Sequence, residues 1–137
     1  MLFRSARSDL NALLGHPVVG ASWEGFVIEN LLAAAPNRTL PTFYRTSARA
    51  EIDLLLELPG GELWAVGIKL GTVPKCERGF HNARDDVRPD KSFVVYSGDK
   101  RFTISEGIEA ISIREMAKEL AEIGGRRAAG RQSHNTR

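Results

Sequence analysis

Apolar and polar positions follow two different periods along the chain, and together they predict a mixture of helices and strands. Apolar residues at helical spacing indicate helices, whereas short alternating or continuous apolar runs indicate strands. Proline and glycine mark the ends of several of these patterns. The predicted elements are, in order, helices at 8–14 and 18–35, strands at 40–46, 50–58 and 62–69, a helix at 75–87, strands at 93–96, 101–104 and 109–113, and a helix at 114–123.

The strands at 50–58 and 62–69 carry the most informative pattern. Three consecutive leucines follow Asp53, which is typical of a strand covered on both faces. A Pro-Gly-Gly sequence separates the two strands and predicts a tight turn, so we expect an antiparallel hairpin. In such a hairpin the start of the first strand lies beside the end of the second. Asp53 is therefore expected next to the strand end that carries Lys69.

Length and composition indicate one globular domain. The chain has 137 residues, of which 42% are hydrophobic and 26% charged, as is ordinary for water-soluble proteins. No apolar run approaches the roughly 20 residues of a membrane helix, and the N-terminus lacks the apolar stretch of a signal peptide. We therefore expect a cytoplasmic protein without membrane contact. The single cysteine, Cys76, agrees with a reducing compartment.

The net charge of +2 comes from the end of the chain. Residues 124–137 contain four arginines and no acid, which leaves 15 basic and 17 acidic residues, or −2, in residues 1–123. The terminal stretch also has no apolar periodicity, so the sequence predicts a domain at 1–123 and a basic, disordered tail at 124–137. A solvated chain end is the favoured interpretation of the tail. Nonspecific contact with phosphates is the alternative.

From the helix at 18–35 onward, the predicted order is α-β-β-β-α-β. Glu24 lies on the first helix, Asp53 on the second strand and Lys69 at the end of the third strand. This arrangement resembles the PD-(D/E)XK nuclease core, the restriction-endonuclease-like fold, in which helices flank a mixed sheet. The resemblance implies that Asp53 is the acid of the hairpin, Lys69 the catalytic lysine and Glu24 the acid of the preceding helix. Glu29 on the same helix is an alternative to Glu24. The first acid of the (D/E)-X-K motif falls on Gly67, so the motif is degenerate there.

A closer resemblance is carried by four sequence blocks in the same order. The chain is similar to an uncharacterised domain at the C-terminal end of many prokaryotic AAA-type ATPases, over about residues 10–97. That family usually has glutamate where Gly67 stands. The resemblance implies an ATPase partner, in cis or in trans, although the chain contains no G-x-x-x-x-G-K-[ST] phosphate loop. The blocks lie at residues 13–17, 20–31, 43–55 and 64–69.

The chemistry implied by the resemblance is hydrolysis of DNA or RNA phosphodiesters with Mg²⁺ or Mn²⁺. Such a reaction needs carboxylate oxygens around the cation, here Glu24, Asp53 and a third acid, and a lysine to orient water or stabilise the developing charge. Glycine at position 67 offers no oxygen. Because Mg²⁺ commonly needs only one or two protein carboxylates, we expect weakened rather than abolished activity.

Each of these residues also has a structural interpretation. Asp53 could instead form an ion pair with Arg45 or Lys69, since an unpaired charge in an apolar strand is unfavourable. Arg45 either contacts nucleic-acid phosphate or extends from an aromatic strand end into solvent. Gly67 is either a lost acid or a point of close packing. At the level of the whole protein, the alternative to a nuclease is a non-catalytic module that binds nucleic acid or docks on an ATPase.

Other catalytic chemistries have less support in the sequence. The three histidines lie far apart and only one cysteine is present, so a zinc site is not expected. A nucleophile pair of Cys76 and His81 lacks an orienting third residue.

Overall fold

The computed structural model describes residues 23–135, with side chains up to residue 125. The predicted helix at 8–14 and the first residues of the helix predicted at 18–35 lie outside the described residues. The elements are, in order, α2 (Trp23–Ala34), β1 (Leu40–Arg45), β2 (Glu51–Glu57), β3 (Leu63–Ile68), α3 (Arg78–Val87), β4 (Lys91–Tyr96), β5 (Phe102–Ser105), β6 (Ile108–Ser112) and α4 (Ile113–Asn135).

Six strands form one mixed sheet in the order β1-β2-β3-β4-β6-β5. The β1-β2-β3 part is antiparallel, β3, β4 and β6 run parallel, and β5 returns antiparallel at the far edge. The parallel pairing of β3 with β4 is possible because α3 carries the chain back between them. The predicted mixed α/β class and the predicted order α-β-β-β-α-β, here α2-β1-β2-β3-α3-β4, are confirmed.

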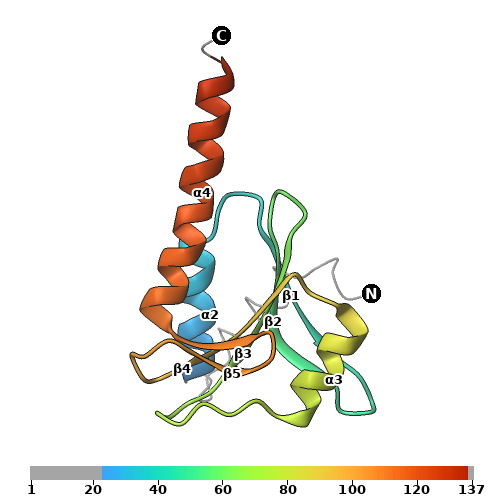
Figure 1. Cartoon of the computed structure of the whole chain (residues 1–137). Helices are drawn as coiled ribbons and strands as arrows, with labels where there is room; N and C mark the ends of the chain where they lie inside the picture. The colour runs from blue at the N-terminus through green and yellow to red at the C-terminus, as the bar shows by residue number, and fades with distance from the viewer. Residues whose placement is uncertain (1–22, 136–137) are drawn as a thin grey trace.

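Helices cover the two faces of the sheet unequally. Figure 1 shows α2 and α4 side by side on one face and the shorter α3 on the other. The core between the sheet and the α2–α4 pair contains fully buried Trp64, Leu31 and Leu56, whereas the cluster under α3 contains Phe80 and Leu55. We call these the α2–α4 face and the α3 face.

An irregularity in β2 changes the direction of its side chains. Thr42 of β1 pairs with Leu55, but Tyr44 pairs with Ile52, so β2 advances three residues while β1 advances two. One extra residue in a strand is a β-bulge, which bends the strand and re-aims its side chains. Asp53 lies within this irregular step. The bulge also explains why Ile52 and Leu55, an odd number of positions apart, both join the α3-face cluster.

Two helix boundaries differ from prediction by more than one residue. α3 begins at Arg78 rather than residue 75. α4 continues to Asn135, beyond the predicted end at Ile123. Two glycines at 124 and 125 weaken a helix, but the alanines and arginines after them are good helix formers, and Gly124 packs beside Pro36. The predicted division into a domain at 1–123 and a basic tail stays a prediction.

Within the part of the chain that the structure describes, none of the helices combines the length and apolarity that crossing a membrane would require.

Candidate functional site

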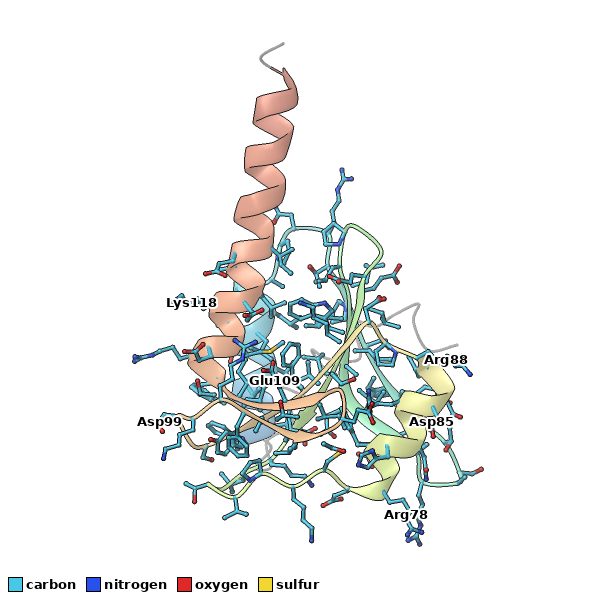
Figure 2. The ribbon with its side chains drawn as sticks, viewed as in Figure 1. Arg78, Asp85, Arg88, Asp99, Glu109 and Lys118 are labelled. Carbon is cyan, nitrogen blue, oxygen red and sulfur yellow. The ribbon has the colours of Figure 1, made fainter. Side chains whose placement is uncertain are left out.

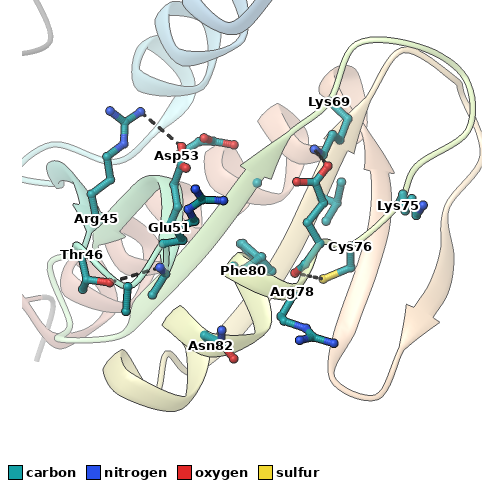
Figure 3. A pocket seen from close by; sticks show the side chains of 17 residues that line it. Arg45, Thr46, Glu51, Asp53, Lys69, Lys75, Cys76, Arg78, Phe80 and Asn82 are labelled. Carbon is teal, nitrogen blue, oxygen red and sulfur yellow. Dashed lines mark hydrogen bonds and ion pairs between the residues drawn. The ribbon is translucent and has the colours of Figure 1, made fainter.

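A cavity of about 750 Å³ opens on the α3 face between the diverging ends of β2 and β3. The β2–β3 ladder ends at the pair of Leu54 and Val66, so the next residues of the two strands are free to line the cavity. Four of the predicted site positions line it, namely Arg45, Asp53, Gly67 and Lys69, and Figure 3 shows the side chains of Arg45, Asp53 and Lys69. Their roles in catalysis or binding stay predictions.

The side chain of Asp53 accepts a hydrogen bond from β3 just beyond the last backbone pair of the β2–β3 ladder. The backbone N–H of Ile68 donates to Oδ2 of Asp53, with 2.8 Å between nitrogen and oxygen. Burial raises the pKa of Asp53 to about 6, and the Ile68 hydrogen bond opposes that rise. The negative charges of Glu24 and Glu51 raise the pKa further, while Lys69 lowers it. The carboxyl group is thus held partly buried in a negative surrounding.

Glu24 lies near Asp53 without lining the cavity. It stands in the first turn of α2 and is exposed. Its charge raises the pKa of Asp53, whereas Glu29, the alternative on the same helix, is not among the charges that act on Asp53. Glu51, two residues before Asp53 on β2, does line the cavity. Glu51 is thus a cavity residue without a predicted role, although its position two residues from Asp53 on one strand is a signal visible in the sequence.

Lys69 is bound to a residue that the sequence did not indicate. Its Nζ lies 2.6 Å from Oε2 of Glu77, the residue directly before α3. The Glu77 side chain makes no capping hydrogen bond to its own helix. Its hydrogen bond to Lys69 lowers the pKa of Glu77. On the opposite side, the backbone carbonyl of Lys69 accepts the indole N–H of Trp23 at 2.8 Å, which ties α2 to the end of β3.

Gly67 is a close-packing point between β3 and α3. A β-carbon at this position would lie 3.3 Å from Cε1 of Phe80 and 3.7 Å from Cγ2 of Val94. The aromatic ring of Phe80 thus crowds the β-carbon of any side chain at position 67. An acid at this position could enter the cavity only if Phe80 moved.

Arg45 pairs with Glu51 and not with Asp53. The ion pair has an N–O distance of 3.2 Å, and its two side chains are 63% and 46% exposed, so it contributes at most about 1 kcal/mol. The guanidinium also lies 5.7 Å from the ring centre of Phe43. Within residues 23–125, Asp53 itself has no ion-pair partner within 4.0 Å. The suggested structural pairs of Asp53 with Arg45 or Lys69 are therefore not formed.

Arg49 occupies a rare backbone conformation at the rim of the cavity. Its φ of 69° lies in the left-handed region, in the turn between β1 and β2. Thr46 closes this turn, because its hydroxyl accepts the N–H of Ala50. A β-carbon on Gly79 would lie 2.5 Å from the carbonyl oxygen of Arg49, so only glycine allows α3 to approach the turn this closely.

The carboxylates do not form a cage suited to a divalent cation. Asp53 lines the cavity, position 67 carries no acid and is crowded by Phe80, and Glu24 stands outside. In the described part of the chain, no three histidine, cysteine, aspartate or glutamate side chains are grouped so that they could hold a metal ion. The predicted metal ligands Glu24 and Asp53 thus stay a prediction. The cavity can, however, attract anions through its basic residues.

The sequence matches a known family model over most of its length. Residues 19–116 match the family described as "Domain of unknown function (DUF4143)". An uncharacterised protein of Mycobacterium bovis and one of Mycobacterium tuberculosis are each 40% identical to the chain over 105 residues. These residues make up 75% of this chain but only 23% of each relative, so the chain spans about a quarter of their length. No solved structure matches the chain.

Proposed function

The chain belongs to this family of domains of unknown function, and from that premise we propose that it is a PD-(D/E)XK nuclease-like module that binds nucleic acid and has a degenerate cleavage centre. The proposal combines the cavity, which retains Asp53 and Lys69 on neighbouring strands, with the loss of the motif acid at Gly67. Binding of the nucleic-acid backbone is the main activity. Cleavage is weak or lost.

The contact between Gly67 and Phe80 carries this proposal. A glutamate or aspartate in place of Gly67 would bring its β-carbon within 3.3 Å of the Phe80 ring, which is 7% exposed and packed in the α3-face cluster and would have to shift by a few tenths of an ångström. The position is therefore adapted to packing as well as deprived of an acid. A merely mutated but otherwise competent site would leave the space beside position 67 open.

The charges around the cavity support binding of an anion. Five basic residues line it, against three acidic ones. Nucleic acid is bound largely through neutralisation of phosphates by lysine and arginine, which makes the affinity fall with salt. The basic residues are Arg45, Arg49, Lys69, Lys75 and Arg78, and the acidic ones are Glu51, Asp53 and Glu77.

The proposal is tested by introducing an acid at position 67, with and without truncation of the neighbouring Phe80. We expect the wild-type protein to bind DNA or RNA in a salt-dependent manner and to cleave little with Mg²⁺ or Mn²⁺. Gly67→Glu alone should gain little cleavage because Phe80 crowds the new side chain, whereas Gly67→Glu with Phe80→Ala should gain more. Adding Lys69→Ala should remove the gain. Plasmid nicking and cleavage of labelled single strands are the measurements.

Two results would count against the proposed function. Absence of salt-dependent nucleic-acid binding by the wild type would exclude the binding module. Efficient metal-dependent cleavage by the wild type, lost in Lys69→Ala, would show that the centre is complete despite Gly67. Circular dichroism and thermal unfolding of each variant must accompany these assays, because the Phe80 substitution opens part of the α3-face cluster.

A second candidate is docking on a larger partner, which the coverage of the relatives favours and which the resemblance described above implies to be an ATPase. The matched region is 23% of each mycobacterial protein, so in those proteins the domain is joined to a much longer polypeptide. Mixing this chain with the rest of the M. tuberculosis relative, followed by size-exclusion chromatography and an ATP hydrolysis assay, tests this candidate. A stable complex or a changed hydrolysis rate would support it.

A further inference from the structure

Of the five basic side chains that line the cavity, two form ion pairs with acids of the same cavity and three do not. Arg45 pairs with Glu51 and Lys69 with Glu77. Arg49, Lys75 and Arg78 have no ion-pair partner within 4.0 Å among the side chains of residues 23–125. They come from three separate segments, namely the β1–β2 turn, the β3–α3 connection and the first turn of α3.

We propose that Arg49, Lys75 and Arg78 form a phosphate clamp, through which the cavity takes an unpaired nucleotide of a single-stranded nucleic acid. This inference rests on the proposed function and specifies its substrate class. The three cations would contact the phosphates next to the nucleotide. The nucleotide itself would enter the space between β2, β3 and α3.

The backbone holds Arg49 in a fixed position at the rim of the cavity. A non-glycine residue in the left-handed region is unfavourable, and such residues persist where the surrounding structure holds them. Here the turn hydrogen bond to Thr46 and the close approach of Gly79 do so. Glycine would suit this φ of 69° better than arginine. Arg38 and Arg88 share this conformation, so what distinguishes Arg49 is its place at the rim of the cavity.

The interior of the cavity explains the preference for an unpaired nucleotide. Part of its lining is apolar and includes Gly67, Phe80 and Val94, and the last two present 7% and 2% of their surface. Paired bases are stacked inside a duplex and cannot reach such a lining, whereas an unpaired base can pack against aromatic and apolar side chains. The volume of about 750 Å³ lies within the roughly 300–1,000 Å³ of small-ligand sites.

The matched pair Arg49→Gly and Arg38→Gly tests the clamp. Arg38 is also an exposed arginine with a positive φ, of 72°, but it lies in the connection before β1, at the other end of that strand, and lines a different cavity. Both variants lose one positive charge and relieve the same backbone conformation. Both should therefore melt at a slightly higher temperature than the wild type. Only Arg49→Gly should lose affinity for nucleic acid.

Fluorescence anisotropy with labelled oligonucleotides of about 12 nucleotides, near the usual site size of single-strand binders, provides the measurement. Single-stranded DNA, single-stranded RNA and a blunt duplex of equal length are titrated at several salt concentrations. For Arg49→Gly we expect about a tenfold loss of single-strand affinity and a salt slope smaller by about 0.7. Arg78→Ala should behave in the same way.

Lys118→Ala serves as a second charge control. Figure 2 shows Arg78 at the start of α3 and Lys118 on α4, and the two helices pack on opposite faces of the sheet. Lys118→Ala and Arg38→Gly should both bind as the wild type does. The arginines near the C-terminus are present in every variant, so their contribution cancels in these comparisons.

Three results would overturn the clamp. They are equal binding of duplex and single strands, equal losses in Arg49→Gly and Arg38→Gly, and displacement of the oligonucleotide by polyglutamate at equal charge concentration. In each of these cases the protein still binds nucleic acid, so the proposed function survives. Failure of the wild type to bind any of the three probes would instead overturn the proposed function itself.

Discussion

The two faces of the sheet differ in how completely they are filled. On the α2–α4 face, two helices close over a continuous apolar core in which Trp64, Leu31 and Leu56 are fully buried. On the α3 face, one ten-residue helix covers a smaller cluster and leaves a cavity lined by eight charged side chains. One face thus provides most of the apolar burial, and the other provides the chemistry.

Unfavourable local features are concentrated on the α3 face. It holds the bulge in β2, the left-handed Arg49, the partly buried Asp53 and the close approach at Gly79. The left-handed Arg49 and the partly buried carboxyl of Asp53 are unfavourable by themselves, so they persist only because the rest of the fold compensates. The comparison suggests that the α2–α4 face supplies the stability that allows the α3 face to remain open.

The largest change in the free energy of unfolding is expected when two neighbouring leucines on β2 are truncated one at a time. Leu56→Ala removes a fully buried side chain from the α2–α4 core, and Leu55→Ala removes a 4% exposed one from the α3 face. Within the usual range for such truncations, we expect losses of about 4 and about 2 kcal/mol respectively. Urea unfolding measures both. Equal losses, or a larger loss for Leu55→Ala, would contradict the comparison.

An intermediate effect is expected from Asp53→Asn. The folded-state pKa of about 6 lies above the ordinary value of 3.8, so the unfolded chain loses its proton first as the pH rises. The stability of the wild type should therefore fall between about pH 4 and pH 6 and then stay level. Asn keeps an oxygen for the Ile68 N–H and carries no charge, so the variant should lack this fall. Above pH 7 it should be more stable by about 1–3 kcal/mol.

Unfolding midpoints of wild type and Asp53→Asn between pH 4 and pH 8 check this expectation. Glu57→Gln is a suitable control, since Glu57 is an exposed acid at the far end of the same strand. A wild-type stability that rises from pH 4 to pH 6, and does so only when Asp53 is present, would show that the carboxylate is stabilised in the fold rather than strained.

The smallest changes in stability are expected when a glycine within a helix is replaced by alanine, and they should have opposite signs at two such positions. Gly79→Ala would place a β-carbon 2.5 Å from the carbonyl oxygen of Arg49, whereas Gly125 in α4 has no atom within 4 Å of such a carbon. Gly79→Ala should lose about 1–2 kcal/mol despite the better helix propensity of alanine. Gly125→Ala should gain about 0.5–1 kcal/mol. Thermal unfolding compares them, and a stabilised Gly79→Ala would show that α3 can move away from the turn.

The part of the structure that follows from local patterns could be predicted from the sequence. The Pro-Gly-Gly turn fixes the hairpin register, and that register brings Asp53 beside the strand end that carries Lys69. The helix and strand order is likewise encoded in the periodicity of apolar residues. Even the alternative interpretation of Gly67 as a close-packing point was available, because glycine in a strand often marks such a contact.

The remaining features depend on contacts between segments that are distant in sequence. Glu77 reaches Lys69 because the crossover folds back over the end of β3, and no periodicity encodes this contact. The partner of Arg45 proved to be Glu51 because the β1–β2 register decides which acid faces it. The extension of α4 past Gly124 also follows from packing, since α2 lies along α4 and Pro36 lies beside Gly124.

The hydrogen bond from Trp23 to the carbonyl of Lys69 gives the molecule an optical probe of its own. The chain has two tryptophans, and the other, Trp64, is fully buried in the α2–α4 core. Emission from Trp64 should therefore report global unfolding, while the partly exposed Trp23 should respond to displacement of the β3 end. In a Trp64→Phe protein, a shift in fluorescence on adding oligonucleotide would follow occupancy of the cavity without any attached label.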